Sequence, residues 1–134
     1  KVQADVYFED KLGKENIESG VIVQKSTEEC GYPLYSLEVD WDKYIFSVNI
    51  RDNIYTVETD SGDFERETWQ RVAGVYTGEE LNIYVDDLLV DSVEVSGQMA
   101  SSYDDKYLII GYDKICDGGQ LNDVSIDNVI IRGQ

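Results

Sequence analysis

Residue types alternate with a period of two between Trp69 and Asp91, and this is the clearest pattern in the chain. In the second half of the segment, apolar residues take every other position, at Leu81, Ile83 and Val85. Glycine and acidic residues interrupt the alternation at 77–80 and again at 86–87. Alternation bounded by such residues is typical of antiparallel hairpins with one buried face. The segment therefore predicts two amphipathic strands and the start of a third.

The same pattern recurs along the whole chain, whereas no segment keeps a helical period. It predicts strands at Val2–Phe8, Val21–Lys25, Leu34–Asp40, Lys43–Ile50, Asn53–Glu58, Trp69–Tyr76, Leu81–Val85, Leu88–Val95, Tyr107–Tyr112 and Ile126–Arg132. Tight turns are expected at 41–42, 51–52 and 86–87, and short helical turns at 63–68 and 97–105. Many short strands joined by frequent turns predict an all-β, antiparallel two-sheet β-sandwich.

A length of 134 residues fits one domain, residues 1–134. No apolar run approaches the ~18–20 residues of a membrane span, so no membrane insertion is expected. The first residues already read as a strand, without Met or the apolar region of a signal peptide. We therefore expect a mature fragment or an excised module of a larger protein.

The charge of the chain excludes several kinds of partner and site. There are 28 acidic and 11 basic residues, which give a net charge of −17. This field repels phosphate backbones and anionic membranes, so no nucleic-acid partner is expected. The absence of histidine rules out Ser-His-Asp and Cys-His catalysis and imidazole metal sites. A bound metal would need oxygen ligands, which makes Ca²⁺ the natural candidate.

The two cysteines, Cys30 and Cys116, both fall in polar segments. In an oxidising compartment two exposed thiols are expected to pair, which predicts a disulfide between them. The alternative is two unrelated thiols in a reducing compartment.

Three segments together resemble a known family. They are 4–8, whose Tyr7 replaces the usual Trp, the hairpin 69–86, and the closing strands 108–111 and 126–132. The chain resembles the laminin-G-like (LamG-like jelly roll) modules of the concanavalin A-like lectin/glucanase superfamily, although Asp87 stands where the family usually has Gly. The resemblance implies a concanavalin A-like jelly roll of two stacked sheets. It also implies a mostly non-catalytic module, secreted or at the cell surface, that binds glycans or proteins.

The resemblance further implies a structural calcium near Asp127. In related sandwiches an Asp at this point of the last strand helps to hold the ion, together with oxygens from the early chain. Glu9 and Asp10, just after the first strand, are the expected neighbours, with backbone carbonyls and water completing the six to eight ligands. The alternative is that Asp127 caps a turn or accepts backbone hydrogen bonds.

Candidate ligand-binding residues centre on Trp41, which lies in a predicted turn between Asp40 and Asp42. Sugar recognition requires flat aromatic faces together with fixed carboxylates and amides. Further aromatic candidates are expected to lie opposite their strands' apolar neighbours or at a loop edge: Tyr7, Tyr35, Tyr55 and Tyr112. The alternative is that Trp41 folds back over the sandwich edge and the tyrosines are ordinary sheet aromatics. Trp69, which begins a strand, is expected to be structural.

A catalytic function is the least favoured interpretation. The run Glu38-Val39-Asp40-Trp41-Asp42 resembles the Glu-x-Asp-x-Glu signature of retaining endoglucanases, whose carboxyl pair is ~5–5.5 Å apart. Here the last position is an Asp, and the motif enters a hairpin turn. The sequence therefore predicts a non-catalytic carbohydrate-binding module that acts outside the cell on a glycan or polysaccharide. The alternatives are an adhesion or structural domain that binds a surface protein, and a small hydrolase or lyase.

Overall fold

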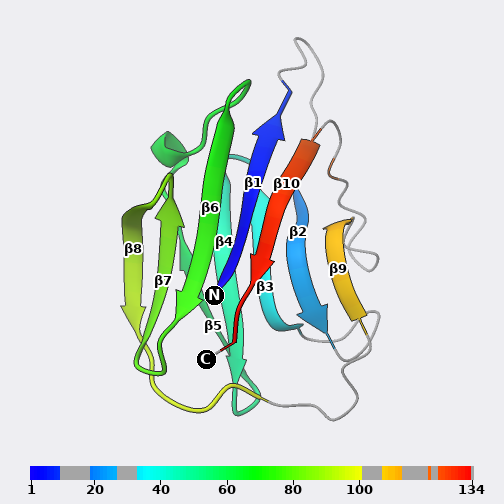
Figure 1. The fold of residues 1–134 in the computed structure, drawn as a ribbon. Helices are drawn as coiled ribbons and strands as arrows, with labels where there is room; N and C mark the ends of the chain where they lie inside the picture. Colours follow the sequence, from blue (N-terminus) through cyan, green and yellow to red (C-terminus); the bar gives the residue numbers. More distant parts are fainter. Residues whose placement is uncertain (10–18, 27–32, 101–106, 113–120, 122–123, 134) are drawn as a thin grey trace.

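The computed structural model describes residues 1–9, 19–26, 33–100, 107–112, 121 and 124–133. Two antiparallel five-stranded sheets pack face to face (Figure 1). The front sheet has the order β10 (Val124–Ile131), β1 (Val2–Phe8), β6 (Trp69–Tyr76), β7 (Glu80–Val85), β8 (Leu88–Glu94). The back sheet has the order β5 (Asn53–Glu58), β4 (Lys43–Ile50), β3 (Pro33–Asp40), β2 (Ser19–Ser26), β9 (Tyr107–Tyr112). The predicted two-sheet sandwich is confirmed, and every predicted strand is present.

The core fills the space between the sheets, mainly with side chains from alternating positions of β1, β3, β4 and β7. Its largest fully buried members are Tyr44, Phe8, Phe46, Ile22, Leu37, Leu81 and Ile83. Gly74 lies opposite Phe46, and a Cβ built at this glycine would overlap the phenyl ring. A glycine inside a strand often marks such a close approach. The break in apolar character at Gly74 therefore makes room for an aromatic side chain of the other sheet.

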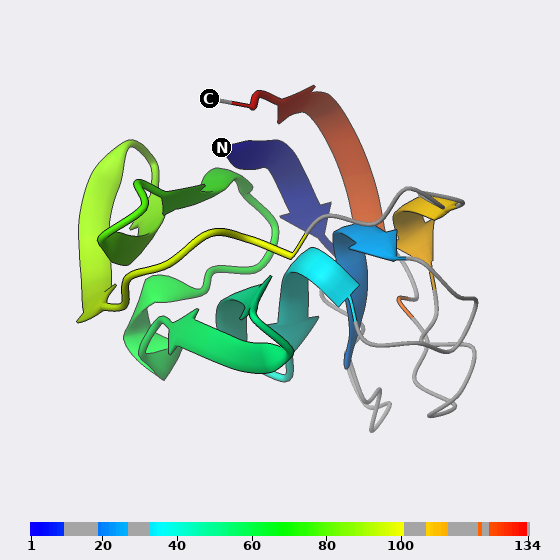
Figure 2. The same cartoon turned by 90° about the horizontal axis from the view of Figure 1, so that it is seen from below.

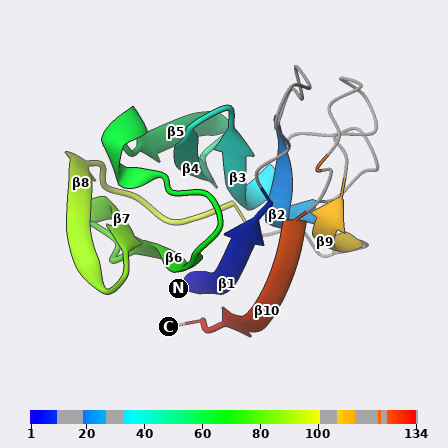
Figure 3. The ribbon, with the colours of Figure 1, turned by 90° about the horizontal axis from the view of Figure 1, so that it is seen from above.

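Two connecting segments close the ends of the sandwich. At the end where β1 finishes, the segment between β5 and β6 crosses from one sheet to the other (Figure 3). Its Phe64 packs against Phe8 and Tyr44, with ring centroids 5.1 and 5.3 Å apart. At the opposite end, the segment after β8 runs between the sheets (Figure 2), and its Met99 pairs with Ile50. Both ends of the core are thus shielded by chain.

The expected helical turns are the main error in the predicted elements. A 3₁₀ turn occurs at Ser61–Asp63, earlier than predicted, and 64–68 is not helical. Asp63 fixes this turn because its carboxylate accepts a hydrogen bond from the Asp60 N–H at 3.1 Å. The chain must then extend to bring Phe64 into the core. Residues 97–100 are also non-helical, and the remainder of that predicted turn lies outside the described residues.

The three predicted hairpin turns are confirmed. Asp86 and Asp87 both adopt the left-handed conformation, with φ of 50° and 65°. Positive φ at both central residues is the pattern of a type I′ turn, which Asp tolerates better than most residues. This conformation explains how Asp replaces glycine at position 87. In the described ranges, no helix is long and apolar enough to cross a membrane.

Candidate ligand-binding site

A shallow pocket of about 220 Å³ lies on the outer face of the front sheet. Its walls come from strands β1 and β6 and from the β7–β8 turn. The lining residues are Asp5, Trp69, Gln70, Arg71, Asp86 and Asp87. An aromatic ring, a guanidinium and three carboxylates therefore meet around one depression.

Strand register places these side chains together. Asp5 lies directly opposite Arg71 in the β1–β6 ladder, and Tyr7 lies opposite Trp69. The residues between them, such as Val6, point into the core. Because side chains alternate between the two faces of a strand, the odd-numbered residues of both strands face outward. The pocket is thus a product of the same alternation that builds the core.

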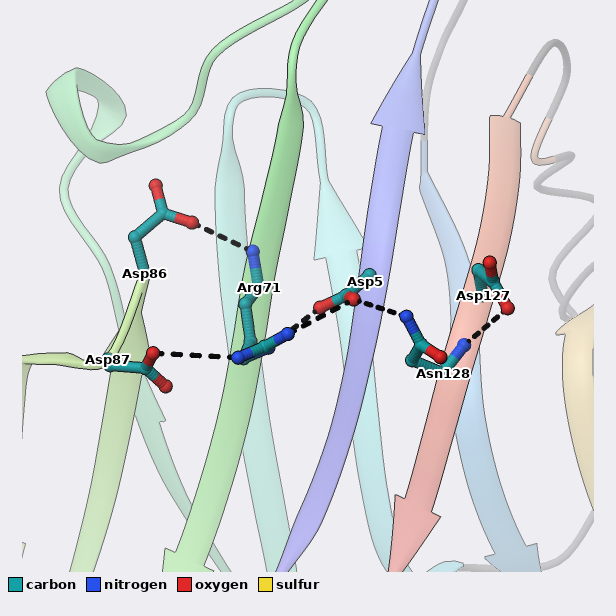
Figure 4. Close-up of polar contacts among 6 residues, drawn as sticks. All are labelled: Asp5, Arg71, Asp86, Asp87, Asp127 and Asn128. Atoms are coloured by element: carbon teal, nitrogen blue, oxygen red, sulfur yellow. Dashed lines mark hydrogen bonds and ion pairs between the residues drawn. The ribbon is translucent and has the colours of Figure 1, made fainter.

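Arg71 connects the carboxylates of the pocket (Figure 4). Its Nε and Nη2 donate to Oδ1 and Oδ2 of Asp5, at 2.9 and 3.4 Å, and its Nη1 lies 3.6 Å from Asp87 Oδ2. The Arg71 backbone N–H also donates to Asp86 Oδ1 at 2.9 Å. The hydrogen bond from Arg71 lowers the pKa of Asp5, and the same bond raises the pKa of Arg71. At neutral pH both groups are charged and hold each other in place.

Asp5 is held from the other side by Asn128 of β10. The Asn128 amide donates to Asp5 Oδ2 at 2.8 Å (Figure 4). Asn128 has a φ of 49°, at an irregularity of the β1–β10 ladder next to Asp5. Such a bulge redirects a side chain, and an asparagine accepts the left-handed conformation at low cost. Asp127 Oδ1 stabilises the bulge by accepting the Asn128 N–H at 2.7 Å.

Trp69 forms the aromatic wall of the pocket. Its side chain is 52% exposed, and its ring lies 5.6 Å from that of Tyr7 at an angle of 46°. Trp69, which is expected to be structural, therefore lies outside the core, and its ring contact is with Tyr7 on the outer face of the sheet. The signal was present in the sequence, since Trp69 shares its face of the strand with Arg71 and not with Val72.

Gln70 anchors the strand position beside Trp69. Its Oε1 accepts hydrogen bonds from Tyr44 Oη at 2.8 Å and from the Glu65 N–H at 2.9 Å. Its Nε2 donates to the Asp63 carbonyl at 2.8 Å. The Gln70 side chain is buried. Its hydrogen bonds link β6 to β4 of the other sheet and to the β5–β6 connection. We expect this network to fix the start of β6, and with it the indole.

Trp41 lies in the β3–β4 turn, at the same end of the sandwich where β6 begins (Figure 1). The residue is 54% exposed, so about half of its surface is open to solvent. Its φ of 60° is uncommon for a bulky residue. Asp40 and Asp42 on either side of it are exposed as well. The predicted platform is thus accessible, but neither Trp41 nor its two acidic neighbours line the pocket.

The predicted tyrosines divide into different environments. Tyr7 faces outward, as expected, and contacts Trp69. Tyr35 and Tyr55 both pair with the core residue Val48, which puts them on the inner face of the back sheet. The prediction that they point outward is therefore wrong, because Tyr35 shares its strand face with Leu37 and Tyr55 shares its face with Val57. The backbone of Tyr112 lies in β9, and its side chain is outside the described structure.

The carboxylates of the glucanase-like motif are divided by the hairpin. Glu38 and Asp40 lie two residues apart on β3, and Asp42 lies in the turn between β3 and β4. Asp40 pairs with Lys43 across the turn. The glucanase signature requires three carboxylates on one strand, and this motif does not place them so.

The calcium and disulfide expectations fall partly outside the described residues. Asp10, Cys30 and Cys116 all lie there. Asp127 accepts the Asn128 N–H, and the Glu9 carbonyl accepts Arg66 Nη1 at 3.5 Å. In the described part of the chain, no group of three or more His, Cys, Asp or Glu side chains is placed to hold a metal. Calcium binding and the disulfide both stay predictions.

Comparisons with known proteins agree with this architecture. The sequence profile described as the concanavalin A-like lectin/glucanases superfamily matches residues 11–133. The receptor-binding domain of botulinum neurotoxin type G is 14% identical over 96% of the chain, with a TM-score of 0.64. The receptor-binding domain of a mosaic serotype C/D neurotoxin is also 14% identical over 96%, with a TM-score of 0.66.

These likenesses show a shared fold. The chain spans 32% and 31% of the lengths of the two neurotoxin domains, about a third of each. No curated protein sequence matches the chain.

Proposed function

The chain belongs to the concanavalin A-like lectin/glucanase superfamily, and from this membership we propose that it is a non-catalytic module that binds carbohydrate outside the cell. The proposed binding site is the pocket beside Trp69. Trp41, at the same end of the sandwich, is proposed as a second aromatic contact for a longer glycan. The similarity in fold to neurotoxin receptor-binding domains supports a binding role.

One observation carries the proposal: a half-exposed indole borders a pocket whose polar groups are already fixed. A sugar ring presents C–H groups that pack on an aromatic face and hydroxyls that bond to carboxylates. Asp5 is held by Arg71 on one side and by Asn128 on the other. Groups held in place before binding lose little conformational entropy when the ligand arrives. The affinity should still be modest, because a pocket of about 220 Å³ accommodates little more than one sugar ring.

A glycan array tests this proposal. We expect the wild-type chain to bind a defined subset of glycans, and Trp69→Ala to reduce that binding at least tenfold. Leu88→Ala is the matched control, because Leu88 is 71% exposed on the edge strand β8 and does not line the pocket. If Trp69→Ala retained binding while Trp41→Ala lost it, the class of ligand would stand and the site would be wrong. A blank array would contradict the proposal.

A protein-binding adhesion domain is the second candidate, and exposed apolar residues favour it. Leu88 and Leu89 of β8 are 71% and 55% exposed at the edge of the front sheet. Exposed apolar side chains on a free strand edge are a frequent protein contact. In that case the array would be blank, and a surface protein captured by the wild-type chain would be lost with Leu88→Asp.

A further inference from the structure

The pocket beside Trp69 is lined by three carboxylates and one guanidinium, so charged acceptors outnumber charged donors. Arg71 directs its Nε and Nη2 at Asp5, and Gln70 directs its Nε2 at the Asp63 carbonyl. Two N–H groups of the guanidinium thus bond to Asp5, and Nη1 lies 3.6 Å from the carboxylate of Asp87. A ligand with acceptor groups alone must compete with these two carboxylates for the single guanidinium of the pocket.

The acceptors of the pocket are open by comparison. Asp86 Oδ1 accepts a hydrogen bond from the Arg71 backbone N–H. Among the described residues, no hydrogen bond is made to the other carboxylate oxygen, Oδ2. Asp87 is 74% exposed and lies 3.6 Å from Arg71 Nη1, an ion pair without a hydrogen bond. Both carboxylates come from the β7–β8 turn, across the pocket from Asp5. A ligand between Trp69 and this turn therefore meets carboxylate oxygens.

The pocket also carries a net negative charge. Three carboxylates, those of Asp5, Asp86 and Asp87, face one guanidinium, so the lining sums to −2. The whole chain, with these residues included, has a net charge of −17. The charge of the protein therefore reinforces the local field at the site, and both oppose an anionic ligand.

We propose that this pocket selects sugars that donate hydrogen bonds and carry no negative charge, with amine-bearing sugars bound most tightly and acidic sugars excluded. The proposal rests on the carbohydrate-binding function proposed above and names its ligand class. Hydroxyl groups donate to the open carboxylates, and an ammonium group donates with a complementary charge. A carboxylate or sulfate that approaches the remaining N–H groups of Arg71 also meets the carboxylates of Asp5 and Asp87, and these like charges repel it.

The test compares forms of one sugar that differ in charge. A neutral oligosaccharide that binds on the array is chosen, together with an amine-bearing and a carboxylate-bearing form of the same sugar. The affinity of the chain for each of the three is measured by calorimetry at low and high salt. We expect the acidic form to bind at least tenfold more weakly than the neutral form at low salt. Affinity for the amine-bearing form should fall severalfold in 0.5 M salt, because screening removes the attraction. Affinity for the neutral form should change less than twofold.

Matched variants separate the pocket from the overall charge. Asp86→Asn with Asp87→Asn removes two charges at the pocket, and asparagine tolerates the left-handed turn conformation. Asp91→Asn with Glu94→Gln removes two charges from exposed positions of β8 that do not line the pocket. We expect the ratio of neutral to acidic affinity to shrink with the first pair and to persist with the second.

The outcomes distinguish this inference from the proposed function. Acidic sugars that bind as tightly as neutral ones, with dependence on Trp69, would overturn the inference and leave the proposed function standing. An equal change of the affinity ratio in both double variants would also overturn it, because the pocket would not set the selectivity. A chain that bound no sugar in any form would overturn the proposed function and this inference with it.

Discussion

Arg71 and Asp5 form a two-point ion pair across neighbouring strands, with Nε 2.9 Å from Oδ1 and Nη2 3.4 Å from Oδ2. The Asp5 side chain is only 15% exposed, whereas that of Arg71 is 42% exposed. The pair therefore lies at the boundary between the sheet and solvent. It ties β1 to β6 and holds one carboxylate of the proposed binding pocket in place.

Acid should remove the contribution of this pair. The hydrogen bond from Arg71 lowers the pKa of Asp5 below its ordinary value of 3.8. The stabilisation is therefore fully present above that value and is lost as the pH falls through the lower pKa of the folded state. We expect Asp5→Asn to unfold about 4 °C lower at pH 7, from a loss of about 1 kcal/mol. Melting curves between pH 2 and 7 should show the two proteins converging at the acid end, and a constant difference would contradict the assignment.

Gly74→Ala should destabilise the core. The added methyl group would overlap the Phe46 ring, and a filled core accommodates such overlap only through strain. We expect a loss of about 2–3 kcal/mol in the free energy of unfolding, measured with urea. Gly62→Ala serves as the control, because a Cβ there meets nothing within 4 Å. Equal stability of the two variants would show that Phe46 can move aside.

Gln70→Leu should weaken both stability and binding. The substitution leaves Tyr44 Oη and the Glu65 N–H without their acceptor in a buried position. Losing such partners costs about 1–3 kcal/mol each, so we expect a loss of about 3 kcal/mol. Gln24→Leu, at a half-buried position of β2, is the control for the apolar substitution. Suppose that Gln70→Leu had the free energy of unfolding of the wild-type chain but no longer bound glycan. Gln70 would then position Trp69 for binding without stabilising the fold.

Trp41→Gly should maintain or raise stability. Trp41 adopts a φ of 60° and is half exposed, so glycine relieves strain at the cost of few contacts. We expect a gain of up to about 1 kcal/mol in chemical unfolding. A clear loss would mean that the indole packs on the sandwich and is not held there for a ligand.

Calcium should raise the melting temperature if the site predicted at Asp127, Asp10 and Glu9 forms. A ligand at a hundred times its dissociation constant stabilises the folded state by about 2.7 kcal/mol. We therefore expect a clear shift between millimolar calcium and chelator, abolished by Asp127→Ala. An unchanged melting temperature would end the calcium proposal and would be consistent with Asp127 serving only the Asn128 bulge.

The sequence predicts the strands well because each buries one face, and burial imposes a period of two. The turn at Asp86–Asp87 was equally visible, since acidic residues interrupt the alternation there. The pocket was less visible. Asn128 and Asp5 are 123 positions apart, and only the pairing of β1 with β10 brings them together. Tyr35 is a different kind of error, because the sequence already places it on the same strand face as Leu37 and Val39, and both of these belong to the core.

The position of β1 between β6 and β10 has a consequence for biosynthesis. During translation, β1 emerges first and can pair with β6 as soon as that hairpin has formed. Its other edge stays open until residues near Asn128 leave the ribosome. Asp5 acquires Asn128 as its second partner only at that late stage, so the proposed binding pocket is complete only after β10 has been synthesised. Chains released before β10 is made would display an unpaired edge of β1, which is a template for pairing with other chains.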